Sequence, residues 1–337
     1  MELDLQQYKI RTDLAVEAKE LAEAAHGAPI PGLNEEVENK AGIKVTRLDV
    51  TNEAASRHIG RVQGHYVTLE VPGLRNQDTD LQERVAKVFV REFTAFMNKI
   101  NIPQDAKVLV VGLGNANVTP DSLGPLVVEN LLVTRHYFEL AADQVQPGYR
   151  EVSAIAPGVL GVTGIESSEV VQAIAEKTKP DLIIAIDALA SKSLERINTT
   201  IQIADIGIHP GSGIGNKRKG LTKEILGVPC IGIGVPTVCY ASTIVGSVID
   251  MMKAHFSQGG LNPSDHTKQI MGMLPELNEQ ERLSLVREVL QPLGHDVVVT
   301  PKEIDEFVED IANVVASGLN AALHEAVNGD NVAAYTH

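Results

Sequence analysis

Two short apolar segments, each continuing into a turn that bears an aspartate, constrain the fold of this 337-residue chain most strongly. The first covers residues 107–111 (KVLVV) and the second residues 181–186 (DLIIAI). Strands that read as continuous apolar runs are typical of parallel sheets covered by helices on both faces. Helical segments at 124–136 and 164–177 lie between them. The alternation predicts an α/β fold with a doubly wound, mainly parallel sheet.

The flanking regions complete this expected architecture. Residues 26–42, with two prolines, three glycines and several acids, are expected to form a loop, and the C-terminal third is expected to be helical. Thr300-Pro301-Lys302-Glu303 has the pattern of a helix start with Thr300 as N-cap. Further helices are expected at 14–25 and 81–100, and further strands at 43–50, 65–71, 201–206 and 230–234.

Charge and composition exclude several classes of protein. The formal net charge is −15, which repels nucleic acid and anionic membranes at long range. Aromatic residues make up 4% and tryptophan is absent, so an aromatic platform for single strands is not expected. Cys230 and Cys239 form no metal-binding pattern and are interpreted as buried thiols. With no signal peptide and no apolar run of membrane-spanning length, a cytoplasmic protein is expected.

The turn after the first strand contains the sequence Gly112-Leu-Gly114-Asn-Ala-Asn117, followed by Val-Thr-Pro-Asp121. It lies at the carboxyl edge of the predicted sheet, where open α/β folds bind their ligands. A dinucleotide fingerprint needs a glycine at position 117, and the P-loop pattern does not occur. A non-catalytic nucleotide-binding module therefore stays only as an alternative.

Asp121 follows the first strand, and Asp187 follows the second in the sequence Ile186-Asp-Ala-Leu-Ala190. If the two strands are neighbours, both carboxylates emerge at one edge of the sheet. Two facing carboxylates share a proton, which supplies an acid and a base for hydrolysis of a peptide bond. Asp187 acting only as the cap of the next turn is the alternative.

A third segment, residues 208–219, is rich in glycine and ends in Lys217-Arg218-Lys219. Its His209 is a candidate third member of the site, or a metal ligand beside the two aspartates, but there is no HExxH pattern. A metal-dependent maturation endopeptidase of the same fold is therefore a further alternative. GxSxG and SxxK patterns are also absent, which disfavours a serine nucleophile.

Taken together, these segments resemble the germination protease family of spore-forming bacteria. The resemblance covers nearly the whole chain in order. It is carried by Tyr8 to Lys19, Gly112 to Gly124, Ile186 to Ala190, Pro210 to Lys219 and Gly234 to Val238.

The resemblance implies an endopeptidase that degrades small acid-soluble spore proteins during germination and acts without a cofactor. It also implies an inactive homotetrameric zymogen, a fold similar to hydrogenase maturation endopeptidases, and the class of an atypical aspartic protease. Its two catalytic aspartates correspond to Asp121 and Asp187. No direct nucleic-acid or membrane partner is expected.

Family substrates are cut after an acid in a context such as Thr-Glu-Ile-Ala-Ser-Glu, and residues 12–17 (TDLAVE) have the same run of residue types. We therefore expect self-cleavage between Asp13 and Leu14, although Asp13 as a helix cap is compatible with the same sequence. This divides the chain into a propeptide, 1–13, and one peptidase domain, 14–337, with C-terminal helices at about 276–327. Lys217, Arg218 and Lys219 are the candidate substrate-binding residues.

Overall fold

The computed structural model describes residues 11–208, 219–257 and 296–327, together with the single residues 281, 284, 288 and 290. Its centre is one mixed sheet in which, within these residues, nine strands take part. The strands in spatial order are β1 (Leu33–Lys40), β2 (Ile43–Val50), β3 (Gly64–Glu70), β7 (Thr200–Ala204), β8 (Cys230–Tyr240), β6 (Leu182–Ala190), β4 (Val108–Gly112) and β5 (Val152–Ile155), while β9 (Val298–Val299) pairs with β8.

The predicted α/β class and the parallel arrangement around the two apolar strands are confirmed. β8, β6, β4 and β5 run parallel to one another, and the β4 residues Val108–Gly112 pair in register with Leu182–Ile186 of β6. The remaining neighbours, from β1 to β8 through β2, β3 and β7, are antiparallel. The sheet therefore has a parallel half, which holds the predicted acidic residues, and an antiparallel extension.

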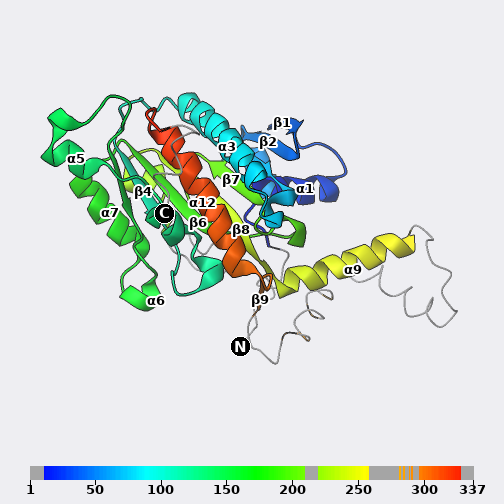
Figure 1. Cartoon of the computed structure of the whole chain (residues 1–337). Helices are drawn as coiled ribbons and strands as arrows, with labels where there is room; N and C mark the ends of the chain where they lie inside the picture. Colours follow the sequence, from blue (N-terminus) through cyan, green and yellow to red (C-terminus); the bar gives the residue numbers. More distant parts are fainter. Residues whose placement is uncertain are drawn as a thin grey trace.

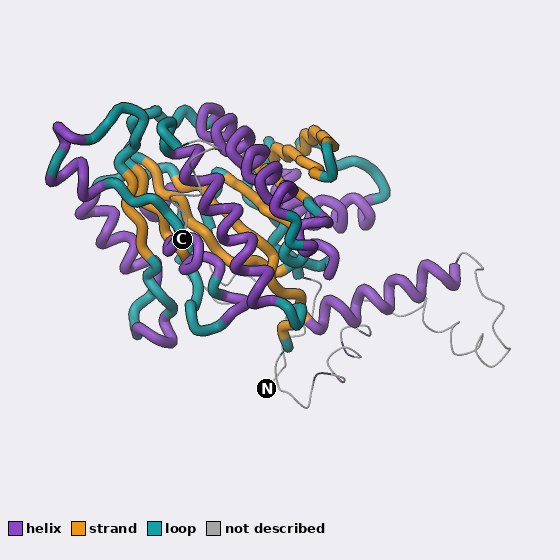
Figure 2. Tube along the Cα trace, viewed as in Figure 1, coloured by secondary structure: helices purple, strands orange, loops and turns teal. Residues whose placement is uncertain are grey.

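Helices cover both faces of the parallel half, as Figures 1 and 2 show. On one face α3 (Thr79–Lys99) and α12 (Ile304–Leu323) lie side by side, next to α4 (Leu123–Glu129). Even-numbered β4 and β6 residues such as Val110 and Ile184 pack there, whereas Leu109 and Ile183 point to α7 (Ser167–Thr178) on the opposite face. This strict alternation explains why both strands are apolar along their whole length.

The other helices are peripheral. α1 (Ala15–His26) and α2 (Glu53–Ile59) pack against β2, β3 and β7 in a separate apolar cluster. α9 (Ala241–Ser257) extends away from the sheet in Figure 1. Short helices complete the described chain: α5 (Arg135–Leu140), α6 (Leu160–Thr163), α8 (Lys223–Leu226), and the 3₁₀ turns η2 (Pro72–Asn76), η3 (Thr119–Asp121), η4 (Ala142–Gln144) and η5 (Leu194–Arg196). None of the described helices is apolar over a length that would cross a membrane.

Three of the local predictions are wrong. Residues 26–42 are not only loop, because Leu33–Lys40 forms β1, an exposed edge strand whose charged sequence hides its extended backbone. The helix expected at 124–136 ends at Glu129, since Asn320 accepts a hydrogen bond from Leu132 N–H and donates one to the Asn130 carbonyl.

The third wrong prediction concerns the start of the last helix. Thr300 does not cap it: α12 begins at Ile304, and the Thr300 hydroxyl donates to the Thr237 carbonyl at 2.8 Å. The predicted cap residue therefore ties the start of the C-terminal segment to β8. This contact lies close to the cavity described below, because Thr237 lines that cavity.

A buried histidine closes the far end of α12. His324 Nδ1 accepts the Arg150 N–H at 3.1 Å, so its Nε2 donates to the Leu132 carbonyl at 3.2 Å. Its side chain is fully buried, and this burial lowers the pKa of His324 to about 4. The neutral imidazole is thus part of the folded structure.

This burial predicts a pH-dependent stability. The folded-state pKa lies below the value of about 6.5 for an exposed histidine, so between these values the unfolded chain binds more protons. The free energy of unfolding should therefore fall as the pH drops from about 6.5 to 4, by at most about 3 kcal/mol from this group. Urea unfolding of wild type and His324→Asn at a series of pH values tests this. An identical pH dependence in the two proteins would contradict it.

Candidate active site

Asp187 lies inside a strand, not at its end. β6 continues past the predicted boundary at Ile186 to Ala190, and Asp187 pairs in register with Gly234 of β8. On its other side β4 has already ended, because Gly112 is paired with Ile186 and the next contact is Leu113 N–H to the Ile186 carbonyl at 2.8 Å. The Asp187 carboxylate, which accepts the Ala188 N–H at 3.0 Å, is half-buried at this opening.

Asp121 lies at the end of the 3₁₀ turn η3, on the chain that leaves β4. The Asn115 N–H donates to both the carbonyl and the Oδ2 of Asp121, at 3.0 and 2.9 Å. The Thr237 hydroxyl, on β8, donates to the Pro120 carbonyl at 2.6 Å. These contacts fasten the turn to the strand that pairs with β6.

Two glycine contacts let the turn fold this closely. Gly114 has φ +115°, and a Cβ there would lie 2.0 Å from the Asp121 carbonyl oxygen. A Cβ on Gly112 would lie 2.1 Å from the Gly124 carbonyl oxygen. Side chains at either position would push Asp121 away from the edge of the sheet, so the glycines serve close backbone packing rather than a cofactor.

The geometry of the turn also argues against the nucleotide-binding alternative. A phosphate cradle needs several main-chain N–H groups that point at the ligand. Here the Leu113 N–H is bound to Ile186, the Asn115 N–H to Asp121, and the Asn117 N–H to the Asn115 side chain. The neighbouring carboxylate would in addition repel a phosphate.

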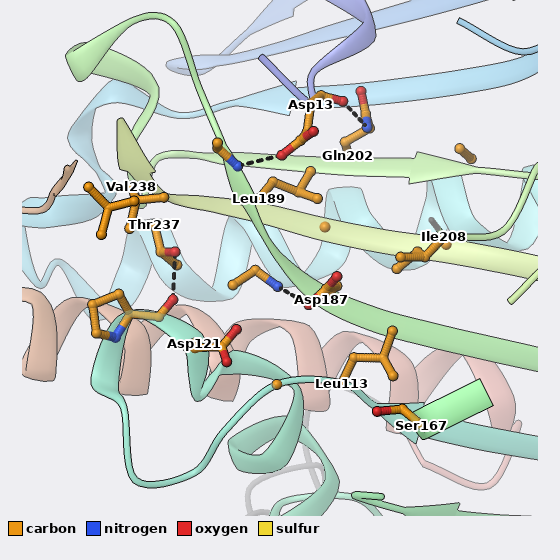
Figure 3. A pocket seen from close by; sticks show the side chains of 18 of the residues that line it. Asp13, Leu113, Asp121, Ser167, Asp187, Leu189, Gln202, Ile208, Thr237 and Val238 are labelled. Atoms are coloured by element: carbon orange, nitrogen blue, oxygen red, sulfur yellow. Dashed lines mark hydrogen bonds between the residues drawn. The ribbon is translucent and has the colours of Figure 1, made fainter. Parts of the chain in front are cut away.

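The structure brings the two predicted carboxylates to one cavity of about 590 Å³. Figure 3 shows Asp121 and Asp187 at its border, one from the turn after β4 and the other from β6. Apolar groups such as Leu113, Leu189 and Ile208 form much of the remaining wall. The cavity is open to solvent at the carboxyl edge of the parallel strands, where a chain segment can enter.

The predicted cleavage segment lies on the same cavity. Asp13 lines it, its N–H donates to the Ala190 carbonyl at 2.8 Å, and its carboxylate accepts the Ala190 N–H at 2.8 Å. The Leu14 side chain is fully buried, and its N–H donates to the Thr12 hydroxyl at 3.0 Å. The N-cap residue of α1 is Leu14, and no side chain caps this end of the helix. Asp13 is therefore not the helix cap that the sequence allowed.

The other candidate residues contribute less to the described site. His209, Lys217 and Arg218 lie outside the described residues. Lys219 is exposed and is not among the described residues that line the cavity.

The metal-dependent alternative finds no support in the described part of the chain. Within it, no group of three or more His, Cys, Asp and Glu side chains could hold a metal ion. Burial raises the pKa of Cys230 to about 12 and that of Cys239 to about 11, so both remain thiols at neutral pH. This agrees with their interpretation as free, buried cysteines.

Three functional candidates were missed by sequence reasoning: Arg61, Gln202 and Thr237 line the cavity together with the aspartates. Thr237 stands in a segment that carries the family resemblance, so a signal existed for it. Arg61 follows α2, and Gln202 lies in β7 of the antiparallel half. Only the pairing of β3 with β7 and of β7 with β8 brings them to the cavity.

This protein belongs to the class of α/β proteins that place two aspartates in an open cavity at the edge of the sheet. Comparisons with known proteins show its family. Residues 11–261 and 257–336 match the family model described as germination protease. Curated germination proteases of Bacillus velezensis and Bacillus subtilis are 50% and 49% identical over 365 residues, covering all of this chain and 99% of each relative. That of Halalkalibacterium halodurans is 50% identical over 370 residues. The chain belongs to the germination protease family, whose members are endopeptidases of spores.

Among solved structures, the chain is similar to a [NiFe] hydrogenase maturation protease, HycI, from Thermococcus kodakarensis KOD1. The match covers 64% of this chain and 92% of that one, at 17% identity and a TM-score of 0.29.

The glycine contact at Asp121 yields a test of the site. Gly114→Ala combines a left-handed φ with a Cβ placed against Asp121, so the carboxylate must move. Displacement of a reacting group by about 1 Å costs on the order of 100-fold in rate. We expect a kcat reduction of that order for proteolysis. The matched control is Gly161→Ala. Gly161 lines the same cavity, and a Cβ added there would have no atom within 4 Å. Equal activity of the two variants would contradict the role of this contact.

Proposed function

We propose that this protein degrades small acid-soluble spore proteins during germination, as an endopeptidase of the atypical aspartic type with Asp121 and Asp187 as its catalytic residues. The observation that supports this most directly is that both carboxylates border one open cavity at the carboxyl edge of the parallel strands. Family membership supports the protease activity itself.

In the proposed reaction the two carboxylates share one proton, because two facing acids resist joint ionisation. The ionised carboxylate takes a proton from water while the water oxygen bonds to the peptide carbonyl carbon. The protonated carboxyl then gives its proton to the amide nitrogen as the C–N bond breaks, leaving a carboxylic acid and an amine. No cofactor takes part in these steps.

The proposal includes a zymogen. Residues 1–13 are the propeptide of a peptidase domain at 14–337, with its C-terminal helices at about 276–327, and the protein cuts its own Asp13–Leu14 bond. The sequence of residues 12–17, which resembles a substrate site, and the position of Asp13 on the cavity wall both support this. In the resting state we propose a homotetramer in the cytoplasm of the developing and germinating spore.

The charge of the protein suits such substrates. With a net charge of −15 the enzyme does not compete for DNA, to which the spore proteins bind. Once released, these substrates are largely unstructured, so an extended segment can enter the cavity. Acidic residues that flank the cut then need a recognition element near the two aspartates, for which Lys217, Arg218 and Lys219 were the first candidates.

Substitution of the aspartates tests the catalytic assignment. Asp121→Asn and Asp187→Asn each remove an acid–base group, so we expect cleavage of a purified small acid-soluble spore protein to fall by at least about 100-fold. Asp105→Asn, in the exposed segment before β4 at the opposite end of the strand, is the matched control and should cleave like wild type. Circular dichroism melts verify the fold. Full activity in either Asn variant would exclude the pair as catalytic.

A second experiment tests the self-cleavage site. Intact-mass spectrometry of incubated protein should show the loss of residues 1–13 and a new N-terminus at Leu14, and Asp121→Asn should prevent this. Asp13→Ala should slow the reaction, whereas Asp4→Ala, an acid of the same segment outside the predicted site, should not. Cleavage at another bond, or equal rates for the two alanine variants, would refute the assignment.

A further inference from the structure

Several groups in the cavity wall hold Asp13 through its main chain and its carboxylate. Asp13 contacts Ala190 through two hydrogen bonds of 2.8 Å, one from its own N–H and one to its carboxylate. Its carbonyl accepts the Gln202 side-chain amide at 3.3 Å. The same Gln202 amide accepts the Ala15 N–H at 2.7 Å, so it spans the predicted cleavage junction.

The Ala190 main chain is available for this pairing because of the unequal lengths of the strands. β4 pairs with β6 only as far as Ile186, whereas β6 continues to Ala190. The register with β8 shifts between Leu189 and Ala190, and Ala190 stays paired with Val238, so within the described residues the free edge of this end of β6 is the one on the β4 side. An incoming chain can therefore add to β6 through main-chain hydrogen bonds, as in other cases of strand addition.

A cation completes the site. Arg61 lines the cavity, and its guanidinium donates to the Thr12 carbonyl. Its Nε is buried and has no hydrogen-bond partner among the described residues. Among the described residues of the cavity wall Arg61 is the basic side chain, while Asp13, Asp121 and Asp187 are the acidic ones. A half-buried arginine whose buried Nε has no acceptor favours a carboxylate nearby.

We infer that Arg61, Gln202 and the main chain of Ala190 form the subsite that binds an acidic residue of the substrate, and that Asp13 occupies this subsite in the uncut chain. The inference rests on the proposed function, which it deepens by naming the groups that select the substrate. It assigns acid recognition to these residues instead of Lys217, Arg218 and Lys219. Removal of residues 1–13 then vacates the subsite for the substrate.

The hydrogen-bond pattern explains why an acid is selected. Ala190 offers an N–H donor that the Asp13 carboxylate accepts, and Arg61 places a positive charge beside the neighbouring Thr12 carbonyl, where it favours an ionised carboxylate. An amide side chain can accept the bond from Ala190, but it gains no charge interaction with Arg61. An apolar side chain would leave the Ala190 N–H without this acceptor, which is costly.

Peptide binding to the full-length protein tests the inference without requiring cleavage. Fluorescence anisotropy would follow a labelled Thr-Glu-Ile-Ala-Ser-Glu peptide and its analogue with both Glu replaced by Gln, on protein carrying Asp121→Asn to prevent cutting. Adding Asp13→Asn should weaken the hold of the chain's own segment and tighten binding of the acidic peptide at least tenfold. The analogue should bind at least tenfold more weakly than the acidic peptide.

Variants of the subsite then assign the selectivity. On that background Arg61→Met should weaken binding of the acidic peptide at least tenfold and remove its advantage over the analogue, and Arg61→Lys should restore part of it. Gln202→Glu keeps an acceptor for Ala15 but adds a negative charge, so it should favour the analogue. The matched control is Arg57→Met, an exposed arginine on α2 that pairs with Glu53. Thermal melts exclude unfolded variants.

The outcomes separate this inference from the proposed function. Equal binding of the two peptides, or unchanged selectivity in both Arg61→Met and Gln202→Glu, would overturn the subsite even if the enzyme cuts spore proteins. Failure of the self-cleaved wild type to cut a spore protein would overturn the function, whatever the peptides do. In self-cleaved enzyme, Arg61→Met should raise KM at least tenfold with kcat changed less; the reverse pattern would contradict a binding role.

Discussion

The parallel pairing of β4 with β6 is the contact on which the rest of the site depends. It joins Val108–Gly112 to Leu182–Ile186, and β4 then stops while β6 continues for four residues. Among the described residues, the difference in length leaves one edge of β6 without a neighbouring strand from Asp187 onward. The chain leaving β4 turns across this opening and carries Asp121, and the N-terminal segment reaches the same opening at Ala190. A single step in the sheet thus brings three distant parts of the sequence to one cavity.

Close backbone packing holds the two aspartates in place with few side chains. The turn at Asp121 is fixed by the Asn115 N–H, by the Thr237 hydroxyl and by glycines at which a Cβ would collide with main-chain atoms. Thr237 is itself fully buried and accepts the Thr300 hydroxyl through its carbonyl. The start of α12 is therefore linked through β8 to the turn that carries Asp121. Such a framework leaves both carboxylates half-buried at the opening.

How much could be predicted from the sequence depends on whether each element is buried on both faces. β4 and β6 are buried on both faces, so their apolar runs identified them as strands. This placed Asp121 and Asp187 at one edge of the sheet. The end of β6 was missed because Asp187 interrupts the apolar run, and the three residues after it are too few to indicate a strand. β1 was missed because an edge strand needs no apolar face. Arg61 and Gln202 could not be found, since only tertiary pairing of the antiparallel half brings them to the cavity.

The composition of the cavity wall suits a proposed site that binds an acid while its own two acids share a proton. A lysine or arginine contacting Asp121 or Asp187 would favour their ionised forms and remove the proton donor. At an effective dielectric constant of 20, a unit positive charge 4 Å from a carboxylate would stabilise its ionised form by about 4 kcal/mol. In the described wall, Asp13 is held by the Ala190 N–H and the Gln202 amide, which carry no net charge, and one arginine contributes its charge beside Thr12. The Asp13 carboxylate is thus held by the neutral Ala190 N–H, while the cation that favours an acid contacts the main chain at Thr12.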